Sequence, residues 1–240
     1  MGNIFRFFLI AFSGLLLVSC AEINNELSCE EILATSYENS SLNSFEKNKF
    51  RDLLINRYPQ YDQMFQEASE ETNIDKNLLA AISFQESQWD PRAKSSMGVR
   101  GMMMVTLETA ALVGVEKRLN PEQNIKGGAR YFAMLQDKNK LGLTEADKLA
   151  IVLASYNLGP TSIINIANQI SKDITNITWN EISERLETIK GQELNLTDKG
   201  SYTRGQQAID YVNRVTDYYS LLSAHSCIAP RDRLTFSLGS

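Results

Sequence analysis

Helical spacing of apolar residues runs through most of this 240-residue chain. Between residues 45 and 223, apolar side chains recur at intervals of three and four residues, which is the pattern of helices that bury one face. No segment shows the alternation of apolar and polar residues that is typical of a half-buried strand, and we find no internal repeat. The sequence therefore predicts an all-α domain of roughly eight or nine helices.

Polar residues mark where several of these helices begin. Four of them directly precede a helical pattern: Asp75, Thr106, Asn120 and Thr144. A side-chain oxygen at this position accepts a hydrogen bond from the first turn of the helix. Thr178 and Glu181 have the spacing of a capping box. We therefore expect helices to start directly after these N-cap residues.

Residues 1–19 have the pattern of a secretory signal. Arg6 precedes an apolar run that is too short to cross a bilayer, and the run ends in Leu17-Val18-Ser19-Cys20. This ending resembles the lipobox of bacterial lipoproteins, which implies that Cys20 becomes the lipidated first residue of the mature protein. The alternative is an ordinary secretory signal with an incidental cysteine. In enterobacterial lipoproteins, an aspartate directly after the lipidated cysteine resembles a mark for retention in the inner membrane. This chain has Ala21 at that position, so we expect a lipid anchor in the outer membrane, on its periplasmic face.

The charge balance excludes several classes of partner. The chain has 24 lysine and arginine residues against 29 aspartate and glutamate residues, and it contains no basic block. Such a chain is not expected to bind nucleic acid or an anionic lipid surface. The single histidine, His225, and the absence of clustered cysteines argue against a zinc site and against a Ser-His-Asp triad. We expect no metal and no cofactor.

Two cysteines remain if Cys20 carries lipid. Cys29 and Cys227 lie near the two ends of the mature chain. In an oxidising compartment an even pair can form a disulfide, which would tie the N-terminal segment to the tail. The alternative is two free thiols.

The composition divides the chain into four segments. Residues 1–19 form the signal peptide, and residues 20–57 form a polar tether with an N-terminal helical segment. Residues 58–224 hold the main helical domain, and residues 225–240 form a C-terminal tail without periodicity. The length after the signal suits one domain with a substantial core.

The stretch from Ile82 to Ala111 carries the candidate chemistry. Glu86 follows Leu79 and Ile82 on the apolar face of the helix expected over residues 76–88. A carboxyl on that face is partly desolvated, which raises its pKa and lets it hold a proton near neutral pH. Glu86 is therefore a candidate general acid and base. The alternative is a glutamate at a helix end that simply reaches water.

A loop with two glycines follows this helix. Pro91 ends the helix, and Gly98 and Gly101 allow positive φ or the close approach of a ligand to the backbone. The run Met102–Met104 comes next and can form either a flexible apolar wall or part of the core. We expect this loop to shape a binding cleft beside Glu86.

Four stretches together resemble the catalytic domain of soluble lytic transglycosylases (SLT), whose lysozyme-like fold is related to goose-type lysozyme. They are Glu86–Ala110, Asn120–Tyr131, the sequence Ala154-Ser-Tyr-Asn-Leu-Gly159, and Tyr202–Gly205 with Tyr211 and Val212 after it. The resemblance covers about residues 58–222, and the motifs occur in the family's order. It implies a lysozyme-like helical domain with a central helix that carries the catalytic glutamate.

The run from Gly98 to Met104 is most similar to the membrane-bound F type of lytic murein transglycosylase. The F type normally carries an amino-terminal domain that resembles solute-binding proteins. This chain has no room for such a domain, so we expect no regulation through it. Ser155 stands where the family's motif usually has alanine, and Met104 stands where soluble members often have glutamine.

The resemblance implies cleavage of peptidoglycan glycan strands at the β-1,4 bond between N-acetylmuramic acid and N-acetylglucosamine, without consumption of water. One glutamate, here Glu86, protonates the leaving oxygen and then takes the proton of the muramyl C6 hydroxyl, which closes a 1,6-anhydro ring. No second carboxylate is needed, in contrast to most glycoside hydrolases. The alternatives are a hydrolytic muramidase on the same fold and an inactive wall-binding lipoprotein that serves an envelope machine, whose identity the sequence does not give.

The resemblance also implies supporting roles. Ser95 or Ser96 would orient Glu86 or a sugar N-acetyl group through a hydrogen bond. Tyr156 would contact the reacting sugar or Glu86, and Asn157 would hold its loop. The other expected substrate-binding residues line the loop or the wall: Gly98, Met103 and Met104.

Overall fold

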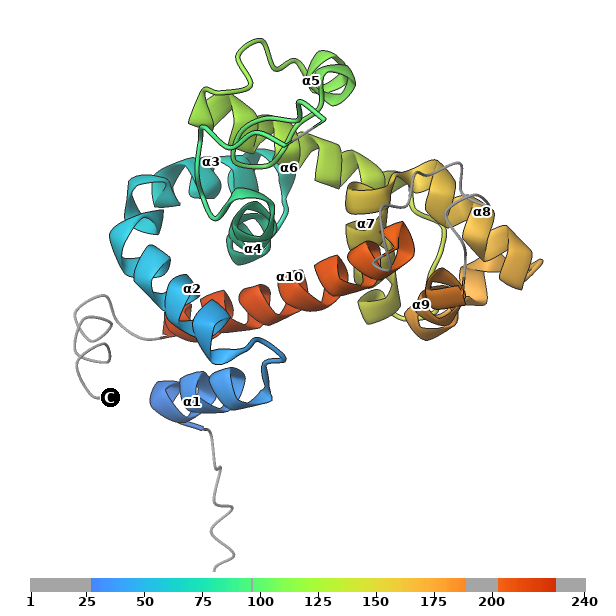
Figure 1. The fold of residues 1–240 in the computed structure, drawn as a ribbon, viewed down its shortest axis with the longest axis horizontal. Coiled ribbons are helices and arrows are strands. Elements are labelled where there is room, and N and C mark those ends of the chain that lie inside the picture. The colour runs from blue at the N-terminus through green and yellow to red at the C-terminus, as the bar shows by residue number, and fades with distance from the viewer. Residues whose placement is uncertain (1–26, 96, 189–202, 228–240) are drawn as a thin grey trace, which may run out of the picture.

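The computed structural model describes residues 27–95, 97–188 and 203–227, and most residues in these ranges are helical (Figure 1). They contain no β-strand, only isolated antiparallel bridges of Arg100 with Lys94 and with Val105, and two short 3-10 turns, η1 (Tyr58–Gln60) and η2 (Ile174–Asn176). The α-helices of the described part are α1 (Cys29–Asn39), α2 (Ser44–Asn56), α3 (Asp62–Thr72), α4 (Lys76–Ser87), α5 (Leu107–Val113), α6 (Pro121–Lys138), α7 (Glu145–Leu158), α8 (Pro160–Ile170), α9 (Trp179–Thr188) and α10 (Arg204–Cys227). The predicted all-α class is confirmed.

The predicted N-caps are confirmed. The four side chains accept hydrogen bonds from the first turns of α4, α5, α6 and α7: Asp75, Thr106, Asn120 and Thr144. Before α9, the Thr178 hydroxyl accepts from the Glu181 N–H (3.3 Å), and the Glu181 carboxylate accepts from the Thr178 N–H (2.8 Å). Each cap satisfies a backbone N–H that the helix leaves unpaired and stabilises the helix by about 1 kcal/mol. These local interactions fix where the helices begin.

Helix α4 lies at the centre of the molecule, where α3 and α10 pack against it (Figure 1). All seven residues from Leu78 to Phe84 are buried. The helix ends at Ser87, and Trp89 closes this end because it is fully buried and its indole N–H donates to the Ala80 carbonyl at 2.9 Å. Glu86 therefore sits in the last turn of a buried helix.

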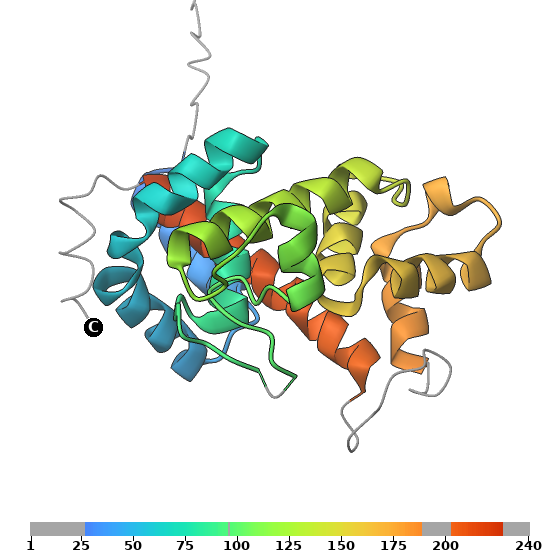
Figure 2. The same ribbon diagram turned by 90° about the horizontal axis from the view of Figure 1, so that it is seen from above.

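The longest helix, α10, packs against α4, α7, α9 and α1. Figure 2 shows α8 and α9 at one end of the molecule and α2 at the other. Phe50 of α2 is fully buried and stacks on Tyr218 of α10, with 5.3 Å between the ring centroids. The segment 20–57, for which the sequence predicts a tether and a helical segment, thus adds α2 to the common core. A capping box between Asn43 and Glu46 starts this helix.

A disulfide joins Cys29, at the start of α1, to Cys227, at the end of α10, with their Cα atoms 5.5 Å apart. Helix α10 extends to Cys227, beyond the tail boundary expected at residue 225, and Ala224 packs against Leu33 of α1 there. Cys20 and the signal segment lie outside the described residues. Within the described ranges, no helix combines the length and apolarity needed to cross a bilayer.

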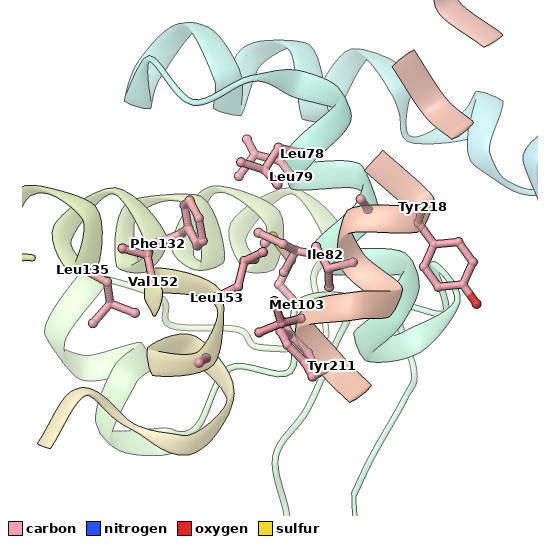
Figure 3. Close-up of a cluster of buried hydrophobic side chains, with 14 of the residues drawn as sticks. Leu78, Leu79, Ile82, Met103, Phe132, Leu135, Val152, Leu153, Tyr211 and Tyr218 are labelled. Atoms are coloured by element: carbon pink, nitrogen blue, oxygen red, sulfur yellow. The ribbon is translucent and has the colours of Figure 1, made fainter. Parts of the chain in front are cut away.

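Side chains of α4, α6, α7, α10 and the methionine run pack together in the core. Figure 3 shows Ile82 of α4, Met103, and Tyr211 of α10 close together, with Phe132 of α6 and Leu153 of α7 on the neighbouring side. All five belong to one cluster of buried side chains. This cluster fixes the positions of α4, α7 and α10, the three helices that carry Glu86, Tyr156 and Tyr211.

Candidate active site

Glu86 is half-buried, and the desolvation of its carboxyl raises its pKa from 4.5 to about 7. Burial has this effect because it disfavours the charged form of the group. The direction agrees with the position of Glu86 on the apolar stripe of α4. A carboxyl with this pKa can both release and take up a proton near neutral pH.

Tyr211 of α10 faces this carboxyl. Its hydroxyl stabilises the carboxylate and partly offsets the effect of burial on the pKa of Glu86. The ring is buried, and within the described residues the hydroxyl makes no hydrogen bond of regular geometry. Burial, and then the nearby Glu86 charge, hold the pKa of Tyr211 well above its usual value, so the phenol stays protonated. The sequence pattern places Tyr211 on an apolar stripe and does not assign it to the site. Its place in the C-terminal motif is the signal that could have found it.

Tyr156, in the last turn of α7, also reaches the surroundings of Glu86. Burial raises its pKa well above the usual value, and the charge of Glu86 adds to the shift. Its hydroxyl donates a hydrogen bond to the Met103 carbonyl at 2.8 Å, and its ring packs against Tyr131 with 5.5 Å between centroids. The structure thus brings Tyr156 near Glu86, with its hydroxyl held by the backbone of the methionine run.

The methionines lie in two different environments. Met103 is fully buried, and a Cβ atom on Gly128 of α6 would overlap its side chain. The Met103 side chain therefore belongs to the core, which is one of the two places that the sequence allows for it, because α6 packs directly on it. Met104 is half-buried and has φ 46°, so its side chain is the one in the run with access to an open surface.

Two serines of α4 attach the methionine run to the helix of Glu86. The hydroxyls of Ser83 and Ser87 both donate to the Met102 carbonyl, at 3.1 and 2.8 Å. Because Ser87 directly follows Glu86, these bonds attach the run to the helical turn that carries the carboxyl. Neither serine is predicted from the sequence, since the contact depends on a distant loop.

The loop after α4 is closed by Ser95. Its hydroxyl oxygen accepts a hydrogen bond from the Val99 N–H (3.1 Å), and its carbonyl accepts one from the Gly98 N–H (3.1 Å). Gly98 adopts φ 78°, which glycine reaches without steric cost. Among the described residues, no hydrogen bond joins Ser95 to Glu86. Ser96 lies outside the described residues.

Asn157 follows Tyr156 at the end of α7. Its Oδ1 atom is buried and accepts no hydrogen bond within the described part of the chain. A buried acceptor without a partner costs about 1–3 kcal/mol, so a ligand that donates a hydrogen bond here would recover that cost. In the same described ranges, no group of three or more His, Cys, Asp or Glu side chains is placed to hold a metal ion.

Comparison with known proteins identifies relatives of this chain. Residues 63–178 match the family model of the transglycosylase SLT domain. The chain is 39% identical over 176 residues to the membrane-bound lytic murein transglycosylase F 1 of Alkalilimnicola ehrlichii, which covers 72% of this chain and 35% of the relative. It is 34% identical over 215 residues to the membrane-bound lytic murein transglycosylase F of Marinobacter nauticus, which covers 86% of this chain and 42% of the relative. The chain thus spans less than half the length of these relatives.

A solved structure shares the fold. The X-ray structure of an inactive mutant of the lytic transglycosylase Slt from Pseudomonas aeruginosa matches with a TM-score of 0.53 and 16% identity, over 85% of this chain and 32% of that chain. The match confirms the all-α, lysozyme-like architecture predicted from the sequence. The family match shows that the chain contains a transglycosylase SLT domain over residues 63–178.

Proposed function

We propose that this protein is a lytic transglycosylase that cleaves the β-1,4 bond between N-acetylmuramic acid and N-acetylglucosamine in peptidoglycan and leaves 1,6-anhydro ends. The observation that carries the proposal is the Glu86 carboxyl, whose pKa burial raises to about 7 within an SLT domain. Relatives named lytic murein transglycosylases support the choice of substrate.

Glu86 carries one proton through both halves of the reaction. The protonated carboxyl donates to the glycosidic oxygen while the bond from that oxygen to the muramyl C1 breaks. The carboxylate then accepts the proton of the C6 hydroxyl while O6 bonds to C1. No water is consumed, and Glu86 returns to its protonated form. A pKa close to the ambient pH suits a group that must first give and then take a proton.

Two tyrosines support the carboxyl in this proposal. Tyr211 stabilises the carboxylate that exists between the two proton transfers, because its phenol lies beside Glu86 and stays protonated. Tyr156 closes the neighbouring side of the site through its bond to Met103. Further substrate contacts are proposed for Ser95, Ser96, Gly98, Met104 and Asn157.

A pair of matched glutamate variants tests the proposal. In Glu86→Gln the side chain keeps its size but cannot transfer a proton, so release of glycan fragments should fall by about 10²–10⁴-fold. Glu108 is an exposed glutamate on α5, and Glu108→Gln should keep the wild-type rate. An active Glu86→Gln variant would refute the proposed role of Glu86. Loss of activity in both variants would instead indicate a reaction with two carboxylates.

We also propose that Cys20 is lipidated and anchors the protein to the periplasmic face of the outer membrane. The sequence Leu17–Cys20 supports this anchor, and relatives are named membrane-bound. In cells that express Cys20→Ala, the variant protein should contain no labelled palmitate. The variant protein should appear in the periplasmic fraction. Membrane association of the variant at the wild-type level would contradict the anchor.

A further inference from the structure

A buried amide holds the methionine run in place. Asn124, near the start of α6, is fully buried, and its Oδ1 accepts a hydrogen bond from the Met103 N–H at 2.7 Å. Its Nδ2 donates to the carbonyls of Arg100 (3.0 Å) and Arg118 (2.8 Å). One side chain thus uses its acceptor and both of its donor hydrogens on the backbones of two loops.

The backbone around this amide is closely packed and conformationally demanding. Gly101 has φ 84°, and a Cβ atom there would overlap the Asn124 amide and the Arg118 carbonyl. Met104 has φ 46°, a region that costs a residue with a side chain about 1–2 kcal/mol. Such a backbone persists only where its surroundings determine it. The bonds to Asn124 supply this constraint.

The peptide that Asn124 holds also contacts the proposed active site. The N–H of Met103 is bound by Asn124, and its carbonyl accepts the hydroxyl hydrogen of Tyr156 at 2.8 Å. Tyr156 in turn lies close enough to Glu86 to sense its charge. A short chain of contacts therefore leads from the buried amide to the surroundings of the carboxyl.

We propose that Asn124 is a positioning residue for the transglycosylase reaction. By fixing the Met103 peptide it holds the Tyr156 hydroxyl, and thereby the Tyr156 ring beside Glu86. This inference rests on the proposed function, because it assigns a role within that same site. Asn124 acts through Met103 and takes no part in proton transfer.

A double-mutant cycle tests whether Asn124 acts through Tyr156. Asn124→Ala removes all three bonds of the amide, whereas Tyr156→Phe removes only the hydroxyl that Met103 holds. The kcat for release of anhydro-muropeptides from soluble glycan strands is measured for wild type, both single variants and the double variant, at a temperature where circular dichroism shows each to be folded. We expect Asn124→Ala to lower kcat at least tenfold. In the double variant, the added Tyr156→Phe should lower kcat by less than a further twofold. Losses that multiply would show independent sites and overturn the inference.

Two control variants separate positioning from general stability. Ser155 is buried next to Tyr156, and its hydroxyl donates to the Ile151 carbonyl within the same helix, so Ser155→Ala should keep the wild-type kcat. Ile163 is fully buried in α8, and Ile163→Ala lowers the Tm without touching the site. If Asn124→Ala lowered only the Tm, as Ile163→Ala should, the positioning role would be excluded.

A conservative variant and amide exchange keep the inference testable if the alanine variant does not fold. Asn124→Asp keeps the acceptor for the Met103 N–H and should retain more of kcat than Asn124→Ala. If Asn124→Ala is unfolded, Asn124→Asp replaces it in the double-mutant cycle. Amide hydrogen exchange at Met103 should be at least tenfold faster in Asn124→Ala than in wild type, with α8 unchanged. Unchanged exchange at Met103 would overturn the inference, whereas a wild type that releases no anhydro product would overturn the proposed function instead.

Discussion

The phenol of Tyr211 and the carboxyl of Glu86 face each other between α10 and α4, and each shifts the pKa of the other. The Tyr211 hydroxyl favours the Glu86 carboxylate and so lowers the pKa of Glu86 against the larger effect of burial. The carboxylate adds to the burial that raises the pKa of Tyr211. The pair therefore combines a proton carrier poised near neutral pH with a phenol that remains a hydrogen-bond donor.

Replacing Tyr211 should move the pH profile of the enzyme to higher pH. Tyr211→Phe removes the group that stabilises the Glu86 carboxylate, so the pKa of Glu86 should rise above about 7. The first step needs protonated Glu86, and the alkaline limb of kcat/KM should move in the same direction. Tyr219 lies on the same helix but senses Asp75, so Tyr219→Phe should leave the limb in place. A limb that moved to lower pH in Tyr211→Phe would show that the phenol does not stabilise the carboxylate.

The raised pKa of Glu86 should also make the folded protein less stable as the pH rises. Glu86 ionises near pH 4.5 in the unfolded chain and near pH 7 in the folded one, so the folded state binds the extra proton between these values. The stability from this proton is complete below about pH 4.5 and is lost as the pH rises through about 7, by about 3 kcal/mol in total. Glu86→Gln removes the ionisation. Its Tm should therefore exceed that of wild type at about pH 8 and approach it at about pH 4.

Thermal unfolding of both proteins across this pH range checks the expectation. If the Tm of Glu86→Gln exceeded that of wild type by the same amount at both ends of the pH range, the difference in stability would come from packing and not from ionisation.

The disulfide between Cys29 and Cys227 should stabilise the fold without taking part in the chemistry. The double variant Cys29→Ser and Cys227→Ser lacks this bond. Its free energy of unfolding, measured by urea titration, should be lower than that of wild type by about 2–4 kcal/mol. Tyr211 lies about four turns from Cys227 along α10, so the rate of the folded variant should equal that of wild type. A large loss of rate would show that the junction of α1 and α10 controls the site.

Local signals in the sequence were sufficient for most of the helices and for the candidate acid. Asn120 and Pro121 specify the start of α6 because the cap and the proline act within one turn. Glu86 could be identified because the period of a single helix places it on the buried face of α4. Both predictions depend on residues that are close in sequence.

Contacts between distant segments could not be predicted in this way. Tyr211 reaches Glu86, and Asn124 reaches Met103, only after helices far apart in the sequence have packed. The same reason applies to the stacking of Phe50 on Tyr218, which joins α2 to a helix that lies far away in the sequence. Periodicity identifies the buried face of a helix but not the neighbour that covers it.

The mass of the products released from purified peptidoglycan sacculi tests the central claim most directly. The wild-type protein should release muropeptides that end in 1,6-anhydro-N-acetylmuramic acid, each lighter by one water than the corresponding reducing product, and Glu86→Gln should release almost none. Products with reducing ends would instead identify a hydrolytic muramidase, and binding to sacculi without any release would identify a wall-binding protein. Either result would contradict the proposal that Glu86 carries one proton through a reaction that consumes no water.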